Sequence, residues 1–412
     1  MSDTLKKIAD NLGVSTINGN YLSGIAEYYG VDLATSTDLI ADIRIAIGGD
    51  LAETNDYLQD IVTTLGGYEP VNGNWMEAWE AITATPPVPV NTTPPALSYG
   101  GRYEGELVYT DNGTWDNSPT SFTYQWYRDA TPISGETLNE YFLAAADADT
   151  YVSCEVTAIN GSGSSTPEPS DAAYIFDYDY ALVYYYYEDT DEDIAILQNQ
   201  FMLAIKAAGV WAKLDVLCVF IGSGKNAANV DWKRLSEVKN YDCDFDTTQG
   251  YTGSSLIPAY IDTNFAATAG TNFTQNNASR YFFPYAFSGA GPMDGSIQGG
   301  GGSRNRMLLN NSTDHRINQL GTLPLSSTFE YTTTVQPKSI HRTSATNVTL
   351  FNGTTSANRT AVSTTLSTAK LYILRDTNDY ADHTVAAYAA GASMVAENTA
   401  FVAAWNTYIT AL

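Results

Sequence analysis

The stretch Gln198–Gly222, QNQFMLAIKAAGVWAKLDVLCVFIG, separates two very different halves of the chain. Its first part has apolar residues near helical spacing, namely Phe201, Ile205, Ala208, Val210 and Trp211. Its last part, Val216–Ile221, is a short apolar run closed by Gly222, which is typical of a buried strand. We therefore expect an amphipathic helix that leads directly into a strand at the entry to the largest domain. We also expect Phe201 and Trp211 to be buried.

The charge of the chain changes at this boundary. The 412 residues carry a formal net charge of −26. Residues 1–192 hold 31 acidic and 5 basic residues, whereas residues 193–412 hold 15 of each. An acidic half repels nucleic-acid phosphates and anionic lipid. We therefore expect no nucleic-acid and no membrane partner, and the length favours two or three domains.

Residues 1–85 contain an internal repeat. Tyr21-Leu22, Leu39-Ile40, Tyr57-Leu58 and Trp75-Met76 recur every 18 residues, and glycines follow three of these pairs. Each unit is predicted to be a short helix, and helices this short are marginal alone. We expect them to form an attachment region that docks on other proteins, although a small helical bundle without a partner is the alternative.

Three further segments separate this region from the boundary. Residues 86–97 form a proline-rich linker with extended polyproline geometry. In residues 98–174, apolar and polar residues alternate with period two, which predicts a small β-sandwich. Trp126 and Cys154 are expected in two different strands of it. Residues 175–194 form an acidic connector whose tyrosine run is expected to be a strand or an intersubunit stripe.

The motifs W-Y-R-D, I-S-G and C-E-V-T-A-x-N-G-S-G in residues 98–174 resemble the bacterial and phage immunoglobulin-like domain. The resemblance implies a sandwich with Trp126 and Cys154 in its core. A single cysteine excludes the inter-sheet disulfide of antibody domains. Such modules are usually spacers.

Residues 195–412 are rich in strand patterns and end in a helix expected at about 395–410. The signatures G-Y-T-G-S-S, H-R-T-S-A-T-N-V-T-L-F-N-G and H-T-V-A-A-Y-A-A-G-A-S-M resemble concanavalin-like (laminin G-like) jelly-roll domains of tailed-phage fibre and decoration proteins. The fold class is therefore multidomain and mainly β, with short helical repeats, an immunoglobulin-like sandwich and a jelly-roll sandwich with flanking helices. Among the expected strands, residues 339–351 form a single one.

The residue patterns give little support for a catalytic site or a metal site. Cys154, Cys218 and Cys243 are far apart, and the three histidines are isolated. The acidic runs at residues 189–193 and 242–246 lack the glycine of a calcium loop. Residues 222–226 lack the full phosphate-loop pattern. We expect no catalytic residue, no metal and no cofactor.

A sugar-binding face is the more plausible site, because sugar sites pair aromatic rings with planar polar groups. The candidate residues are Tyr281, Tyr285, Arg304, Asn305, Arg306 and Asn310. The alternative is that these aromatic residues fill the core.

The sequence thus predicts a phage virion protein of fibre or decoration type, made in the host cytoplasm. The attachment region would bind other virion proteins, and the jelly-roll domain would attach to host-surface glycans. The family resemblance implies a homotrimer. Two alternatives remain, a purely structural decoration protein and a depolymerase of surface polysaccharide.

Overall fold

The computed structural model describes residues 87–187, 191–222, 224–288, 291–297, 304–309, 315–319, 331, 334–376 and 379–412. The predicted helical repeats of residues 1–85 lie outside these ranges. The described chain is mainly β, with several antiparallel sheets and a few helices. It divides into two compact units, which are treated separately.

The smaller unit has described residues at 87–90, 115–121 and 158–165. Hydrogen bonds from two asparagine side chains connect its short segments. The Asn160 side chain donates to the carbonyls of Pro87 and Asn117 at 2.8 and 2.9 Å. The Asn117 side chain donates to the Val88 carbonyl at 2.9 Å.

The expected polyproline linker is in part a strand. β1 spans Val90–Thr93, and the Asn91 side chain donates to the Thr114 carbonyl at 3.2 Å. At these residues a hydrogen-bonded strand stands in place of the expected polyproline geometry.

Between residues 97 and 175, two sheets pack across one core. One sheet holds β2 (Leu97–Tyr99), β3 (Leu107–Thr110) and β7 (Glu140–Phe142). The other is built on β5 (Ser121–Arg128) and β8 (Thr150–Asn160), with β6 (Thr131–Pro132), β9 (Gly163–Ser164), β10 (Glu168–Pro169) and β11 (Ala173–Ile175) beside them. Trp126 and Cys154 are fully buried in this core, as predicted.

The stretch that opens the C-terminal region has the predicted order of elements. Helix α7 spans Glu192–Ala207, with Asp191 as its N-cap, and strand β12 spans Leu214–Val219. Phe201 is buried, whereas Trp211 is only half-buried, beneath the Lys233 ammonium at 4.1 Å.

Two sheets form the C-terminal region, and we call them sheet F and sheet G. Sheet F runs in the order β14-β13-β12-β29-β19-β23-β24-β25. Its strands are β14 (Ser236–Glu237), β13 (Val230–Asp231), β29 (Thr384–Gly391), β19 (Ala278–Ala286), β23 (Lys338–Arg342), β24 (Asn347–Asn352) and β25 (Thr355–Thr360), and the hairpin β16 (Asp244–Asp246) and β17 (Gly250–Thr252) joins β29.

Sheet G runs in the order β15-β18-β26-β20-β21-β22. Its strands are β15 (Lys239–Tyr241), β18 (Tyr260–Ala266), β26 (Lys370–Ile373), β20 (Gly291–Ile297), β21 (Arg304–Leu309) and β22 (Arg316–Gln319). A short hairpin of β27 (Arg375–Asp376) and β28 (Asp379–Tyr380) follows β26.

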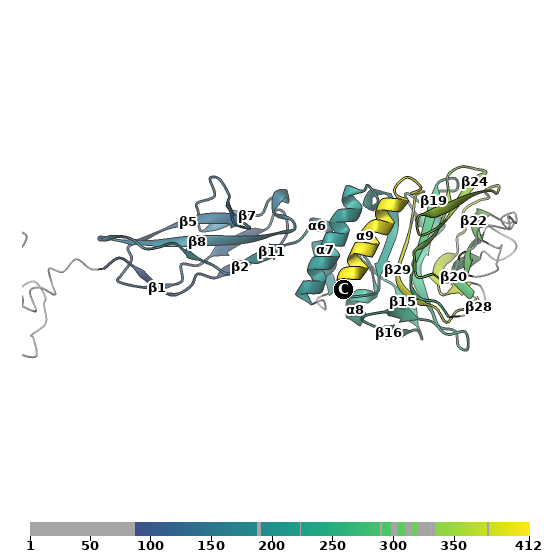
Figure 1. The fold of residues 1–412 in the computed structure, drawn as a ribbon, viewed down its shortest axis with the longest axis horizontal. Helices are drawn as coiled ribbons and strands as arrows, with labels where there is room; N and C mark the ends of the chain where they lie inside the picture. The colour runs from purple at the N-terminus through teal and green to yellow at the C-terminus, as the bar shows by residue number, and fades with distance from the viewer. Residues whose placement is uncertain are drawn as a thin grey trace, which may run out of the picture. The chain divides into compact units, whose positions relative to one another are not determined.

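Sheet F therefore lies in the middle of a three-layer arrangement (Figure 1). One apolar cluster fills the space between sheets F and G. A second cluster lies on the opposite face of sheet F, where helices α7 and α9 (Asn398–Ala411) cover it. Phe401, Trp405 and Tyr408 of α9 are buried there.

The structure overturns the strand alternative for the tyrosine run and the single strand expected at residues 339–351. The tyrosine run is helix α6 (Tyr178–Tyr187), whose Tyr180 and Val183 are buried in the helical layer. Burial in this cluster outweighs the strand preference of tyrosine. Residues 339–351 do not form one strand, because a turn at residues 343–346 divides them into β23 and β24.

Candidate functional site

The face of sheet G that points away from sheet F carries a cluster of tyrosines. Ile261, Leu371 and Ile373 point into the core between the sheets. Because side chains alternate along a strand, Tyr260 and Tyr372 lie on the opposite, outer face. Tyr241 is paired directly with Tyr260 across the strands and shares that face.

The rings of these tyrosines touch one another. Tyr241 and Tyr260 are stacked, with ring centroids 4.5 Å apart and planes at 12°. Tyr372 and Tyr380 lie 5.6 and 6.1 Å from Tyr260. Tyr241 is 39% exposed and the other three rings are half-buried, so the cluster presents aromatic surface to solvent.

One guanidinium completes the cluster. Arg375 lies 4.3, 4.9 and 5.6 Å from the ring centroids of Tyr260, Tyr372 and Tyr380. Such cation–π contacts hold the rings and the cation in one arrangement. We call Tyr241, Tyr260, Tyr372, Tyr380 and Arg375 the tyrosine platform.

The backbone at Leu374 explains how Tyr372 and Arg375 share one face. Residues three apart would point to opposite faces of a regular strand. Leu374 has a φ of 64°, in the left-handed region, and its amide donates to the Met293 carbonyl at 2.9 Å. This break in the strand keeps Leu374 buried and turns Arg375 toward the platform.

A row of cross-strand partners crosses the outer face beside the platform. The register pairs Lys239 with Asp262, Asp262 with Tyr372, Tyr372 with Gly295, Gly295 with Arg306 and Arg306 with Arg316. We call these six residues the central row. It contains one residue from each strand of sheet G and places charged groups on both sides of Tyr372.

Two ion pairs lie along the central row. Lys370 Nζ lies 3.1 Å from Asp262 Oδ2, and this hydrogen bond raises the pKa of Lys370. Arg306 Nη2 lies 3.3 Å from Asp379 Oδ2, and the Asp379 side chain is 69% exposed. Burial raises the pKa of Tyr260 above its ordinary value.

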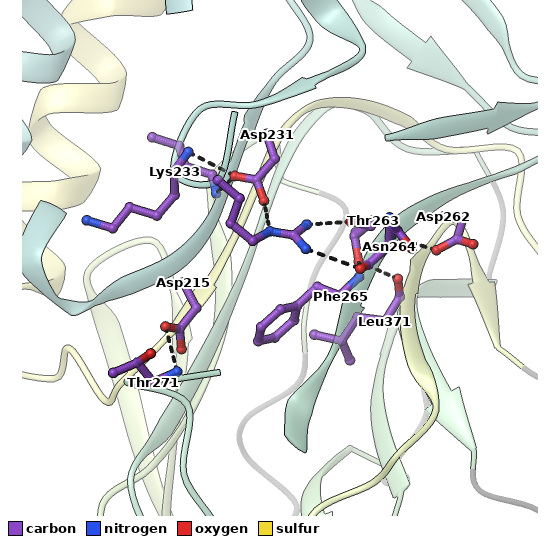
Figure 2. Close-up of polar contacts among 11 residues, drawn as sticks. Asp215, Asp231, Lys233, Asp262, Thr263, Asn264, Phe265, Thr271 and Leu371 are labelled. Atoms are coloured by element: carbon purple, nitrogen blue, oxygen red, sulfur yellow. Dashed lines mark hydrogen bonds and ion pairs between the residues drawn. The ribbon is translucent and has the colours of Figure 1, made fainter. Parts of the chain in front are cut away.

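A polar network fixes the strand that carries Tyr260 (Figure 2). The Asp231 carboxylate accepts from the Arg234 guanidinium, which also donates to the carbonyls of Thr263 and Asn264 at 2.6 and 3.1 Å. The Thr263 hydroxyl then donates to the Leu371 carbonyl at 2.7 Å. Strand β13 of sheet F is thereby connected to β18 and β26, which carry the platform.

The residues predicted as a sugar site do not form one cluster. Tyr281 is fully buried under α9, with its ring 4.9 Å from that of Phe401, so it cannot contact a ligand at the surface. Tyr285 is 38% exposed at the end of β19 in sheet F. Asn310 lies outside the described residues, and Arg304 is described only by its place in β21.

Asn305 and Arg306 are neighbours in β21 but occupy opposite faces of sheet G. Asn305 is fully buried and donates to Ser296 Oγ at 3.2 Å, so its role is structural. Arg306 lies in the central row on the outer face. Of the predicted set, Arg306 is thus the residue that the structure brings to the tyrosine platform.

The platform tyrosines were not predicted as a site, because they are spread from residue 241 to residue 380. The available signal was the alternation of Tyr260 and Tyr372 with apolar neighbours, which marks them as outward-facing. The pairing of β15, β18 and β26 has no such signal in the sequence.

The platform has the composition of a binding surface. Among the described residues, no group of three or more His, Cys, Asp and Glu side chains could hold a metal ion. In the described part of the chain, no helix is both long and apolar enough to cross a membrane. Aromatic faces beside cations and carboxylates can recognise a ligand through stacking and hydrogen bonds.

No protein-family model matches this chain, and no curated protein does. Among solved structures, it is similar to domain 4 of an extracellular arabinanase from Geobacillus stearothermophilus in complex with arabinotriose. That match has 10% identity and a TM-score of 0.29, and it covers 46% of this chain and 98% of that chain.

Two other similar structures are matched over only part of their length. The binding domain of botulinum neurotoxin serotype D has 12% identity and a TM-score of 0.33, with 48% of this chain and 52% of that chain covered. Trypanosoma rangeli sialidase in complex with sialic acid has 10% identity and a TM-score of 0.31, with 76% and 53% covered. The aligned part spans about half of these two chains. At such TM-scores the likenesses carry no argument about what this chain binds.

Proposed function

We propose that this chain is a carbohydrate-binding surface protein and that the tyrosine platform contacts the sugar. The observation that carries the proposal is the group of four touching tyrosine rings and one guanidinium on the outer face of sheet G. A sugar ring has apolar C–H faces and a hydroxyl rim. Half-exposed aromatic rings can bury the former while neighbouring polar groups bind the latter.

The test is glycan binding by the full chain and by three tyrosine variants. Tyr260→Ala and Tyr372→Ala should each weaken binding about tenfold or more, as loss of a central aromatic contact does. Tyr285→Ala is the matched control, because this tyrosine is also exposed but lies in sheet F. The proposal is wrong if the control weakens binding as much as the platform variants, or if no variant weakens it.

We further propose that the protein is part of a tailed-phage virion, with residues 98–174 as an immunoglobulin-like spacer and residues 195–412 as a jelly-roll head. The sequence signatures of these two regions support this, and residues 1–85 would attach the protein to other virion proteins. Antibody labelling of purified particles tests the location, and an unlabelled particle would contradict it. Light scattering of the full chain tests the homotrimer, which a monomeric mass would exclude.

The release of a reaction product distinguishes the depolymerase alternative from a binding protein. If the full chain releases reducing ends from a polysaccharide that it binds, then the protein is an enzyme. Binding without release supports the adhesin. Absence of both supports the purely structural role and overturns the proposal.

A further inference from the structure

Lys338, the first residue of β23, is a lysine buried in sheet F. The residue is 0% exposed. Its Nζ donates to the carbonyl and to the hydroxyl of Thr334 at 2.9 and 3.0 Å, and also to Oδ1 of Asn352. The ring of Phe287 lies 5.6 Å from the ammonium. Within the described ranges, no acidic side chain pairs with Lys338. Because a buried charge without a counter-charge is costly, this environment favours the neutral amine.

The protonation of Lys338 follows from this burial. Desolvation lowers the pKa of Lys338 to about 8, and in the described part of the chain no charged or titratable side chain contributes to the shift. Its direct cross-strand partner on β19 is Phe282, which is apolar. A substantial fraction of the amine is therefore neutral at mildly alkaline pH. A neutral lysine amine is a nucleophile toward carbonyl carbon, whereas the ammonium form is not.

Asn352, the last residue of β24, is held next to this amine by the sheet itself. It is the direct cross-strand partner of Lys338 at the open end of the β23–β24 hairpin. An amide kept in contact with an amine reacts as if at very high concentration. An asparagine followed by glycine ordinarily loses ammonia when the next backbone nitrogen attacks its side chain. Here the Gly353 N–H donates to the Pro337 carbonyl at 2.8 Å, so the lysine is the better placed nucleophile.

We propose that Lys338 and Asn352 form an intramolecular isopeptide bond. The neutral Nζ attacks Cγ of Asn352, the bond between Cγ and Nδ2 breaks, and Nδ2 leaves as ammonia after it has received one proton from Nζ. The Thr334 hydroxyl lies 3.0 Å from Nζ and 3.5 Å from Asn352 Oδ1, where it can carry that proton. The reaction needs no oxidant and no further reactant. Thr334 is exposed, so the ammonia has a route to solvent.

The bond would close the open end of a hairpin that lies beside an edge of sheet F. Strand β24 pairs with the edge strand β25, so the link ties the outermost strands to the body of the sheet. A covalent link of this kind restrains the unfolded chain as a disulfide does, but reductants do not break it. The tyrosine platform lies on sheet G, so this inference is independent of carbohydrate binding.

The mass of the intact, denatured full chain tests the bond. It should lie below the mass calculated from the sequence by one molecule of ammonia. In chain made by cell-free synthesis and sampled over time, the loss should be about tenfold or more faster at pH 9 than at pH 6, because it needs the neutral amine and the pKa of Lys338 is about 8. A mass equal to the calculated one after prolonged incubation at pH 9 would overturn the proposal.

Digestion with trypsin locates the bond. Trypsin cleaves after free lysine and arginine, so the unlinked chain gives the separate peptides 317–338, 339–342 and 343–359. The isopeptide bond blocks cleavage after Lys338 and joins peptide 317–342 to peptide 343–359 as one branched product. Loss of ammonia without this product would come from a succinimide at an asparagine and would contradict the proposal.

Four variants assign the roles. Lys338→Met and Asn352→Leu should each have the full calculated mass and give no branched product. Thr334→Val should slow the loss of ammonia about tenfold or more, because it removes the proton carrier. Lys370→Met is the matched control, since it removes a lysine that is paired with Asp262 in sheet G, and it should lose ammonia as the wild type does. Ammonia loss that persists in Lys338→Met, or that disappears in Lys370→Met, would refute the assignment.

Discussion

The outer faces of the two C-terminal sheets are both rich in aromatic residues, but they differ in what lies on them. On sheet F, Tyr281 and Phe283 are fully buried, and Phe401 and Trp405 of α9 pack on them. On sheet G, Tyr260 and Tyr372 are half-exposed and lie next to cations. Aromatic residues on a strand therefore do not reveal a binding face by themselves. Their exposure depends on whether a helix covers that face of the sheet.

The same contrast holds for ionisable groups. His341, on the covered face of sheet F, is fully buried, and burial lowers its pKa to about 3. Lys370, on the outer face of sheet G, has a raised pKa because it donates to Asp262. Desolvation dominates on the covered face, and pairing dominates on the exposed one.

The largest expected effect is loss of the cover. Phe401→Ala should lower the free energy of unfolding by about 3–5 kcal/mol, because it leaves a cavity among Tyr281, Phe283 and Phe201. Tyr372→Ala is the matched change on the exposed face and should lower it far less. Denaturant unfolding measures both, and similar losses would show that the two faces are equally buried in solution.

A loss of similar size is expected at the ion pair buried between the two sheets. Arg280 and Asp294 are both fully buried, at 2.5 Å, and the Tyr388 hydroxyl donates to the same carboxylate at 2.8 Å. Asp294→Asn leaves a buried guanidinium without its counter-charge, and we expect a loss of about 3–5 kcal/mol. A loss below about 1 kcal/mol, the range of exposed pairs, would contradict this burial.

His341 should make the covered face sensitive to acid. The unfolded chain binds a proton near pH 6.5, whereas the folded chain resists protonation until about pH 3. The contribution of neutral His341 to the free energy of unfolding is therefore fully present above pH 6.5, the pKa in the unfolded chain. It is lost as the pH falls, by up to about 1.4 kcal/mol per pH unit. Denaturant unfolding at pH 7, 6, 5 and 4 should show a steeper loss in the wild type than in His341→Asn. Parallel pH profiles would refute the assignment.

The smallest effect is expected at the pair of Lys370 with Asp262, of which the Lys370 side chain is 41% exposed and the Asp262 side chain is 7% exposed. Lys370→Met removes the partner of Asp262 on the outer face of sheet G and should change the free energy of unfolding by no more than about 1 kcal/mol. Thermal unfolding in low and high salt checks this, because screening should reduce the difference between variant and wild type. A larger or salt-independent loss would mean that this pair is shielded from solvent.

Local patterns predicted local structure well. The helix and strand around residues 198–222 and the C-terminal helix follow from apolar spacing, because an element that buries one face must carry that period. The strand alternative for the tyrosine run is wrong. Its residues are apolar without interruption rather than alternating, and a buried helix and a buried strand then have the same sequence pattern. The prediction of one strand over residues 339–351 is wrong because the turn at 343–346 contains no glycine or proline that would indicate it.

The candidate site was predicted only at Arg306. Arginine and asparagine neighbours at 304–306 suggested one polar cluster, but alternation in β21 sends Asn305 inward and Arg306 outward. Tyr281 was misjudged because exposure depends on α9, which follows it by more than a hundred residues. Pairing of distant strands sets these positions, and sequence periodicity does not encode pairing.

The position of β29 in sheet F also has a consequence for how the protein folds. This strand pairs with β12 on one side and β19 on the other, although both precede it by a long stretch of chain. Neither neighbour can complete its hydrogen bonding during synthesis until Thr384–Gly391 has been made. Pairings this distant in sequence form slowly. Until then one edge of each of these two apolar strands stays unpaired, and folding of this region competes with aggregation.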